Sequence, residues 1–163
     1  MAADQPAAVL TWTGISNACT VIGRQVSADG IPDVIVGVIR GGMIPAVLLS
    51  HTLACRDVRG ISLACTQSEG VNAAKAPRPV LANPGSAGQV TGLDVLIADD
   101  VAGSGATART ATALLHEAGA ARIRLAVCAV NSLNWPAGGP GPGEVLDYVG
   151  GYYQGWVVLP WEQ

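Results

Sequence analysis

The stretch from Val95 to Thr110, VLIADDVAGSGATART, constrains the fold more than any other part of the chain. Its first four residues form an apolar run typical of a strand that is buried on both faces of a parallel sheet. Two carboxylates, Asp99 and Asp100, end that run, a loop of small residues follows over 102–106, and a helical pattern continues to a stop at Gly119. A strand, a tight loop and a helix in this order favour an α/β fold with a mainly parallel sheet.

The loop after the acid pair offers several hydrogen-bond donors. Glycines let its backbone turn sharply and present N–H groups, hydroxyls lie beside them, and the positive end of the following helix dipole points into the loop. These features predict a site for a phosphate monoester. Its residues are Ala102, Gly103, Ser104, Gly105, Ala106 and Thr107.

Asp99 and Asp100 lie at the carboxyl end of the predicted strand, where ligands bind in open α/β sheets. There they can accept hydrogen bonds from sugar hydroxyls or help to hold Mg²⁺. A second interpretation stays open for this stretch alone, in which the loop only caps a helix and the two acids are ordinary residues near its N-terminus.

A second loop of the same kind follows the apolar run DVIVGV over 33–38. Arg40, Gly41 and Gly42 come next, and AVLLSHTLAC then reads as a helix. Two glycines after an arginine can form a pocket of backbone donors beside a fixed cation, although a plain turn with a surface arginine is the alternative. Because both loops follow buried strands and open helices, we expect them at the same edge of a parallel sheet.

The other elements follow from composition and periodicity. We expect a loose terminus over 1–10, a helix over 11–25, strands over 58–64 and 122–130, and an edge strand over 145–149. The segment 66–92 is rich in Gly, Pro, Asn, Ser and Ala and has no period of its own, with Lys75 and Arg78 as its only cations. So long a loop in a compact domain is either functional or disordered.

Composition excludes several classes of protein. At 163 residues a single domain is the default, and a net charge of −3 without a basic stripe argues against a nucleic-acid partner. Short apolar runs and a start without a basic segment predict no membrane span and no signal peptide, hence a cytoplasmic protein. Four cysteines lack metal-ligand spacing and are expected to be buried thiols: Cys19, Cys55, Cys65 and Cys128.

The acid pair and its loop match neither the P-loop, since no lysine follows Gly105, nor the dinucleotide-binding fingerprint. They resemble the phosphoribosyl pyrophosphate motif of the type I phosphoribosyltransferases. GVIRGGMIPAVLLSHTL resembles the first diphosphate-binding loop of the xanthine-guanine enzymes of that family, and DYVGGYYQGWVVLPWEQ resembles their C-terminal end. The resemblance covers nearly the whole chain in the same order.

The resemblance implies a single domain over 1–163 with a three-layer α/β/α fold, a mobile flap at about 66–92 and a small C-terminal hood at about 131–163. It implies transfer of the 5-phosphoribosyl group from phosphoribosyl pyrophosphate to a nitrogenous base, with Mg²⁺ and release of pyrophosphate, in a homodimer or homotetramer. Arg40, Gly41 and Gly42 would hold the diphosphate, and Arg40 would also act in catalysis on the leaving group. Asp99 and Asp100 would act in catalysis by contacting the ribose and the metal, and the loop after them would wrap the 5′-phosphate.

The resemblance also suggests roles for four residues outside these loops. Trp156 would lie on the face of a purine and Val157 would contact its edge, unless the tail tryptophans only cover the sheet edge. Lys75 and Arg78 would reach the diphosphate when the flap closes, unless they are solvated loop charges.

Two positions depart from the pattern of purine-salvage relatives. An acid that hydrogen-bonds the purine N7 is replaced by Gly103, and a lysine that reads the 6-oxo group is replaced by Val130 or Asn131, with Asn131 the polar candidate for a base contact. Three explanations stay open: an acceptor without N7, such as a 7-deazapurine; an ordinary purine enzyme whose proton passes to water or substrate; or a non-catalytic nucleotide sensor.

Overall fold

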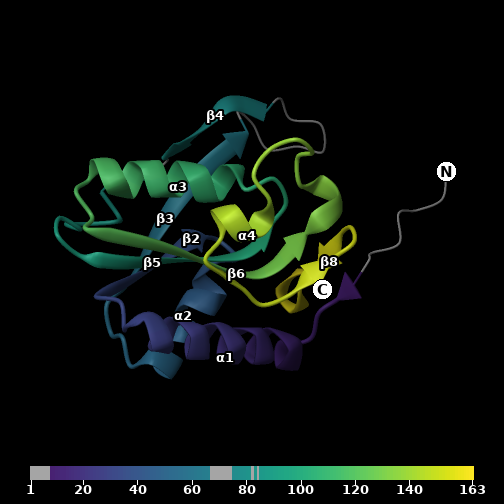
Figure 1. Ribbon diagram of the computed structural model, residues 1–163, viewed down its shortest axis with the longest axis horizontal. Helices are drawn as coiled ribbons and strands as arrows, with labels where there is room; N and C mark the ends of the chain where they lie inside the picture. Colours follow the sequence, from purple (N-terminus) through teal and green to yellow (C-terminus); the bar gives the residue numbers. More distant parts are fainter. Residues whose placement is uncertain (1–7, 67–74, 82, 84) are drawn as a thin grey trace.

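The computed structural model describes residues 8–66, 75–81, 83 and 85–163; of residues 64–66 and 75–81 only the backbone is described. A central sheet in this part of the chain has the strand order β4-β3-β2-β5-β6-β7, and β8 also pairs with β6 (Figure 1). All of its pairings are parallel except that of β3 with β4. The strands are β2 (Val34–Ile39), β3 (Val58–Thr66), β4 (Lys75–Leu81), β5 (Asp94–Ala102), β6 (Arg122–Asn131), β7 (Tyr148–Val149) and β8 (Tyr152–Tyr153).

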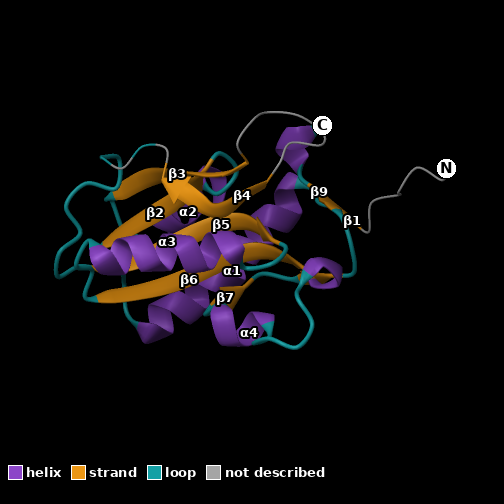
Figure 2. Cartoon of the chain, turned by 90° about the horizontal axis from the view of Figure 1, so that it is seen from above, coloured by secondary structure: helices purple, strands orange, loops and turns teal. Residues whose placement is uncertain are grey.

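Helices cover both faces of this sheet. On one face α1 (Trp12–Asp29) and α2 (Met43–Leu53) pack on side chains such as Ile35, and on the other α3 (Ala106–Glu117) packs on side chains such as Val36. Successive residues of a buried strand point to opposite faces, so each central strand contributes to two cores. Figures 1 and 2 show the resulting layers, which confirm the expected three-layer α/β/α fold.

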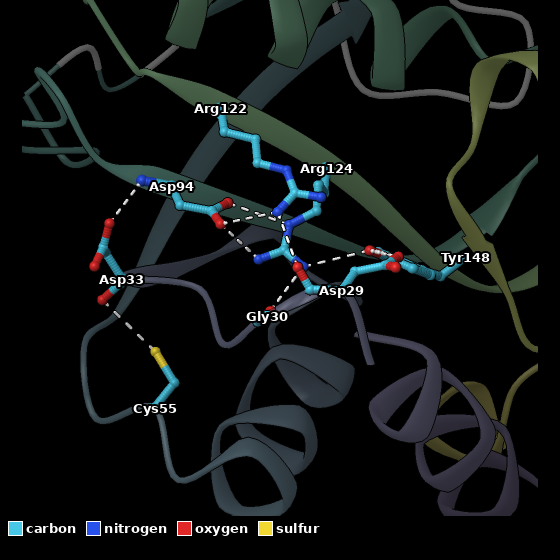
Figure 3. A network of polar contacts seen from close by, with 8 residues as sticks. All are labelled: Asp29, Gly30, Asp33, Cys55, Asp94, Arg122, Arg124 and Tyr148. Atoms are coloured by element: carbon cyan, nitrogen blue, oxygen red, sulfur yellow. Dashed lines mark hydrogen bonds and ion pairs between the residues drawn. The ribbon is translucent and has the colours of Figure 1, made fainter. Parts of the chain in front are cut away.

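A buried arginine ties the sheet together at the amino ends of its strands (Figure 3). Arg124 is 2% exposed and donates to both carboxylate oxygens of Asp94, at 2.8 and 3.2 Å. It also donates to the carbonyl of Gly30 at 2.9 Å and to the hydroxyl of Tyr148 at 3.3 Å. That hydroxyl donates to the carboxylate of Asp29 at 2.8 Å, so one network joins β5, β6, β7 and the end of α1.

Three of the expected boundaries near the ends of the chain are wrong. Ala8–Val9 form a short strand, β1, which pairs in parallel with β9 (Val157–Val158), so the terminus is not loose at these two residues; residues 1–7 lie outside the described part. α1 runs to Asp29 rather than residue 25 because the first strong helix stop is Gly30, at φ +109°. The expected strand over 145–149 shrinks to β7, since Pro142 opens a short helix, α4 (Pro142–Val145), just before it.

Part of the segment 66–92 forms a strand that its composition does not predict; residues 67–74, 82 and 84 lie outside the described part. Its residues 75–81 form β4, which pairs antiparallel with β3. Two prolines lie in β4, and prolines are tolerated on a strand at the edge of a sheet. Sequence patterns miss such an edge strand because its Gly- and Pro-rich surroundings are typical of loops.

The expectation for the cysteines is confirmed at three positions. Cys19, Cys55 and Cys128 are free and buried, and the sulfur atoms of Cys19 and Cys128 lie 3.8 Å apart between α1 and β6. The side chain of Cys65 lies outside the described part of the structure. Among the helices that the structure describes, none is long and apolar enough to cross a membrane.

Candidate functional site

The first loop of the site connects β2 to α2 through Arg40, Gly41 and Gly42. The N–H of Gly42 donates to the carbonyl of Val38 at 2.9 Å, and the peptide bond between Ile39 and Arg40 is cis. A Cβ on Gly42 would lie 2.6 Å from the carbonyl oxygens of Val38 and Ala98. The loop therefore packs directly on β2 and β5, and only a glycine fits at this position.

The acid pair lies within the last part of β5 rather than after it. The strand continues to Ala102, which is buried at 7% exposure, so the expectation that the loop begins at Ala102 is wrong by one residue. Asp99 accepts the N–H of Asp100 at 2.9 Å, and Asp100 accepts the N–H of Val101 at 2.7 Å. Burial, together with the neighbouring charge of Asp100, raises the pKa of Asp99 well above its usual value.

The two predicted loops lie against each other. A Cβ on Gly41 would lie only 1.6 Å from Oδ2 of Asp100, so the carboxylate occupies the space that any other residue at 41 would need. This contact confirms that the Arg40 loop and the acid pair share the carboxyl edge of the sheet.

The second loop, between β5 and α3, has the sharp turn that its glycines predict. Gly105 has φ +70°, and a Cβ there would lie 2.8 Å from the ring of Trp135. The hydroxyl of Ser104 accepts the N–H of Ala106 at 3.4 Å, while the guanidinium of Arg109 donates to the carbonyl of Ser104 at 3.0 Å. Trp135 is fixed in turn, since its indole N–H donates to the carbonyl of Pro140 at 2.9 Å.

Arg109 and Trp135 thus support the loop, and the sequence analysis missed both. The sequence did contain a signal for Arg109: it lies in the first turn of the helix that follows the loop, close enough to reach the loop backbone. The nearest atom to the position of a Cβ on Gly103 is the Cβ of Asn134, at 3.6 Å. That is an ordinary contact distance, so the space beside Gly103 can take a side chain.

A cleft of about 750 Å³ opens between the two loops. The described residues that line it are Val38, Ile39, Arg40, Gly41, Leu63, Asp99, Asp100, Val101, Thr107, Trp161 and Glu162. The structure therefore brings together Arg40, Gly41, the acid pair and Thr107 in one hollow, whereas Gly42 and residues 102–106 of the predicted phosphate loop are not among its lining residues. It adds Trp161 and Glu162, to which the sequence analysis gave no such role.

These two residues reach the cleft through the fold of the C-terminal tail. β9 pairs with β1, and a 3-10 turn, η2 (Pro160–Glu162), follows it. Glu162 closes that turn by accepting the N–H of Leu159 at 2.9 Å. A proline followed two residues later by a glutamate is a sequence signal for such a turn, but it does not say where in the molecule the turn lies.

The three residues predicted to contact the base do not line the cleft in this structure. Trp156 is 62% exposed, and Val157 is buried in β9. Asn131 is 5% exposed, and its side chain accepts the N–H of Leu133 at 3.2 Å, which caps the 3-10 turn η1 (Ser132–Asn134). The contacts of Trp156, Val157 and Asn131 with a base stay predictions.

Lys75 and Arg78 lie on β4, and their side chains are outside the described part of the structure. Their contact with the diphosphate also stays a prediction.

The acid pair has the chemistry that Mg²⁺ requires. Mg²⁺ is usually bound through one or two carboxylates and completes its octahedron with phosphate oxygens and water. Asp99 and Asp100 supply two carboxylates at the cleft, and the described residues contain no group of three or more His, Cys, Asp or Glu side chains that could hold a metal alone. The donor set therefore fits a Mg²⁺ ion that arrives with a phosphorylated ligand.

Comparison with known proteins identifies the family. Residues 8–137 match the model of the phosphoribosyl transferase domain. The xanthine-guanine phosphoribosyltransferase of Gluconobacter oxydans (strain 621H) is 30% identical over 128 residues, which are 78% of this chain and 67% of that protein.

Solved structures agree with this match. The purine phosphoribosyltransferase of Pyrococcus horikoshii Ot3 superposes with a TM-score of 0.75 at 31% identity, covering 95% of this chain and 93% of that one. A hypothetical protein of Neisseria gonorrhoeae with bound ppGpp shares the fold, with a TM-score of 0.78 at 19% identity over 99% of this chain and 92% of that one. From the matched domain, the related sequence and the shared fold, we conclude that the chain belongs to the phosphoribosyl transferase family.

Proposed function

We propose that the protein transfers the 5-phosphoribosyl group from phosphoribosyl pyrophosphate to a purine or a purine-like base and releases pyrophosphate. The observation that supports this most directly is the cleft in which the Arg40 loop meets the acid pair. A protein that only bound a nucleoside monophosphate would need a ribose 5-phosphate site but no second pocket for a leaving diphosphate.

In this reaction the bond from C1 of the ribose to the diphosphate oxygen breaks, and a bond from C1 to a base nitrogen forms. Positive charge develops on the ribose as the diphosphate leaves, and the base nitrogen loses its proton. Asp99 and Asp100 would orient the ribose hydroxyls and stabilise that positive charge. Backbone N–H groups of the Gly103–Gly105 loop and the N-terminus of α3 would hold the 5′-phosphate.

The Arg40 loop would bind the diphosphate, but the single positive charge of Arg40 does not neutralise the negative charge of that group. Arg40 is the one cation among the described residues that line the cleft, and Asp99, Asp100 and Glu162 line it as well. Mg²⁺, held by Asp99 and Asp100, would supply the missing positive charge when it is bound. Lys75 and Arg78 on β4 would add to it if the segment around them closes over the cleft.

A purine-like acceptor is supported by the relatives, which act on xanthine and guanine in one case and on purines in the other according to their names. Gly103 leaves no acid where purine-salvage relatives protonate N7. We therefore propose that the base proton passes to water or substrate, or that the acceptor is a 7-deazapurine with no N7.

Pyrophosphate release from phosphoribosyl pyrophosphate tests the proposal. The assay takes a panel of purines, 7-deazapurines and pyrimidines, each with and without Mg²⁺. We expect release with at least one bicyclic base and only in the presence of Mg²⁺. Release with pyrimidines alone, or no release with any base, would contradict the proposal.

A second candidate function is a nucleotide sensor that binds without turnover, and Gly103 favours it because the loop has lost its proton-handling group. A sensor would show an increase in Tm with a nucleotide or with ppGpp but no pyrophosphate release with any base. The expected homodimer or homotetramer and the cytoplasmic location stay predictions, which light scattering and cell fractionation would test.

A further inference from the structure

The loop that is proposed to hold the 5′-phosphate contains no cation. Its residues 102–107 are Ala, Gly, Ser, Gly, Ala and Thr. Arg40, the one cation among the described residues that line the cleft, belongs to the other loop. A phosphate monoester carries about two negative charges near neutral pH, so this loop needs positive charge from a residue outside it.

Arg109, in the first turn of α3, lies against this loop. Its guanidinium donates to the carbonyl of Ser104 at 3.0 Å, and its Nη1 lies 2.9 Å from the position of a Cβ on Gly105. Arg109 does not line the cleft; with Trp135 it lines a separate hollow of about 190 Å³. Arg109 therefore contacts the phosphate loop without being a wall of the cleft.

The positive charge of Arg109 is not neutralised by a neighbouring acid. No ion pair of the described residues includes Arg109. His116, Glu117 and Glu144 are the other titratable residues along a groove of about 500 Å³ that Arg109 also lines, and neither glutamate pairs with it. Its hydrogen-bond partner, the Ser104 carbonyl, is neutral. The charge is therefore available to an anion held by the loop.

An arginine at this position opposes the dipole of its own helix. The first turn of a helix favours acids over cations, and α3 has neither an acid in its first turn nor a side-chain cap. The helix N-terminus and the guanidinium therefore place positive charge in the same region. An anion bound there offsets this repulsion, whereas the protein without a ligand gains nothing from it.

We propose that Arg109 is a positioning residue for the 5′-phosphate. By binding the Ser104 carbonyl it keeps this acceptor away from the phosphate, and its charge acts across the loop to strengthen the binding of the doubly charged group. The inference rests on the proposed function and specifies where its phosphate loop obtains a positive charge.

Two variants separate the charge of Arg109 from its geometry. Arg109→Gln keeps an N–H donor for Ser104 but is neutral, whereas Arg109→Lys keeps the charge without the planar fork. Calorimetry compares ribose 5-phosphate with magnesium pyrophosphate, for which the Arg40 loop is the proposed site. Arg109→Gln should weaken ribose 5-phosphate about fivefold and Arg109→Lys less than about twofold, and neither should change the affinity for magnesium pyrophosphate. Because Arg109 is exposed, the loss in Arg109→Gln should shrink below about twofold in about 1 M salt.

The Tm of the protein without ligand distinguishes this role from a structural one. If Arg109 only supported the loop, Arg109→Gln would lower that Tm. The proposal predicts that it does not fall, because a cation leaves the first turn of α3, and that ribose 5-phosphate raises it less than in wild type. Arg24→Gln is the matched control: it removes one exposed positive charge from α1, on the opposite face of the sheet (Figure 1), and should change neither the affinity nor the Tm increase.

An unchanged affinity of Arg109→Gln for ribose 5-phosphate would overturn the inference. So would an equal loss in Arg109→Lys, an equal loss for magnesium pyrophosphate, or a lower Tm of Arg109→Gln without ligand. Failure of the proposed function is a different result: the affinities would follow the expected pattern, yet no base would release pyrophosphate. Pyrophosphate release by a protein whose affinities ignore Arg109 would overturn the inference alone.

Discussion

The carboxylate of Asp100 fills the space that a side chain on Gly41 would occupy, with 1.6 Å between its Oδ2 and the position of a Cβ at residue 41. Gly41 belongs to the loop after β2, and Asp100 to the end of β5. The two parts of the chain are 59 positions apart in sequence, yet any side chain at position 41 would displace the Asp100 carboxylate. The proposed diphosphate and ribose sites are therefore in direct contact.

Gly41→Ala should therefore lower kcat/KM for pyrophosphate release by about 100-fold or more, since the Asp100 carboxylate must move by more than an ångström. The Tm should fall much less, because the clash is with the end of the Asp100 side chain, which is only partly buried, and not with a core residue. Gly139→Ala is the control: nothing lies within 4 Å of a Cβ at that position. Wild-type activity in Gly41→Ala would show that the acid pair does not act from its present position.

Asp99→Asn should stabilise the protein near neutral pH while lowering its activity. The pKa of Asp99 is raised in the folded state by burial and by the charge of Asp100, so the folded protein holds this proton more tightly than the unfolded chain does. Stability from this group is complete below the usual pKa of aspartate, about 3.9, and is lost as the pH rises through the raised value. The Tm of Asp99→Asn in Mg²⁺-free buffer should exceed that of wild type at pH 7 and converge with it near pH 4.

Asp57→Asn provides a control of opposite sign. The hydrogen bond from Arg59 lowers the pKa of Asp57, so its loss should decrease the Tm at pH 7. An Asp99→Asn variant that is less stable than wild type at pH 7 would contradict the assignment of a raised pKa to Asp99.

Arg124→Met should lower the free energy of unfolding by about 3 kcal/mol. The change removes the donor to the Tyr148 hydroxyl and the Gly30 carbonyl, and it removes the positive charge that pairs with the Asp94 carboxylate. Urea denaturation measures this change. Arg122 contacts the same carboxylate at 3.5 Å but its side chain is 48% exposed, so Arg122→Met should cost less than about 1 kcal/mol. Similar costs for the two variants would mean that burial does not distinguish them.

Gly103→Asp tests how the base loses its proton. A Cβ at this position meets nothing closer than Asn134 Cβ at 3.6 Å, so the new side chain fits. If the acceptor is an ordinary purine, an acid there should raise kcat/KM about tenfold or more by supplying the missing proton transfer. Gly103→Asn has the same shape without the ionisable group and should give no gain. No gain with either variant would favour an acceptor without N7.

The sequence predicted those parts of the fold that are encoded locally. Local sequence patterns encode the apolar runs of β2 and β5, the glycine-rich turns after them and the helices that follow. For this reason Arg40 and Asp99 could be predicted to lie at the same edge of the sheet. The pairing of Gly41 with Asp100 could be expected in outline, since both loops end parallel strands, but not as a contact of two atoms.

The features that the sequence did not predict depend on contacts between segments far apart in the chain. Trp161 and Glu162 reach the cleft only because Val157–Val158 pair with Ala8–Val9, and two-residue strands leave no periodic signal in a sequence. β4 was missed for a related reason, since its pairing with β3 rather than its composition makes it a strand. Trp156 and Trp161 are both tryptophans of the C-terminal tail, and the sequence does not distinguish their roles. The tertiary structure shows that Trp161 lines the cleft and that Trp156 does not.

The buried network around Arg124 lies at the amino ends of the strands, and every residue proposed to touch substrate lies at the opposite ends. The two ends of the sheet therefore have different roles: the amino ends stabilise the fold, and the carboxyl ends are proposed to bind the substrate. Substitutions at the carboxyl rim can change ligand contacts without touching the buried network that stabilises the other rim. A family built in this way can change its substrates without first acquiring a surplus of stability.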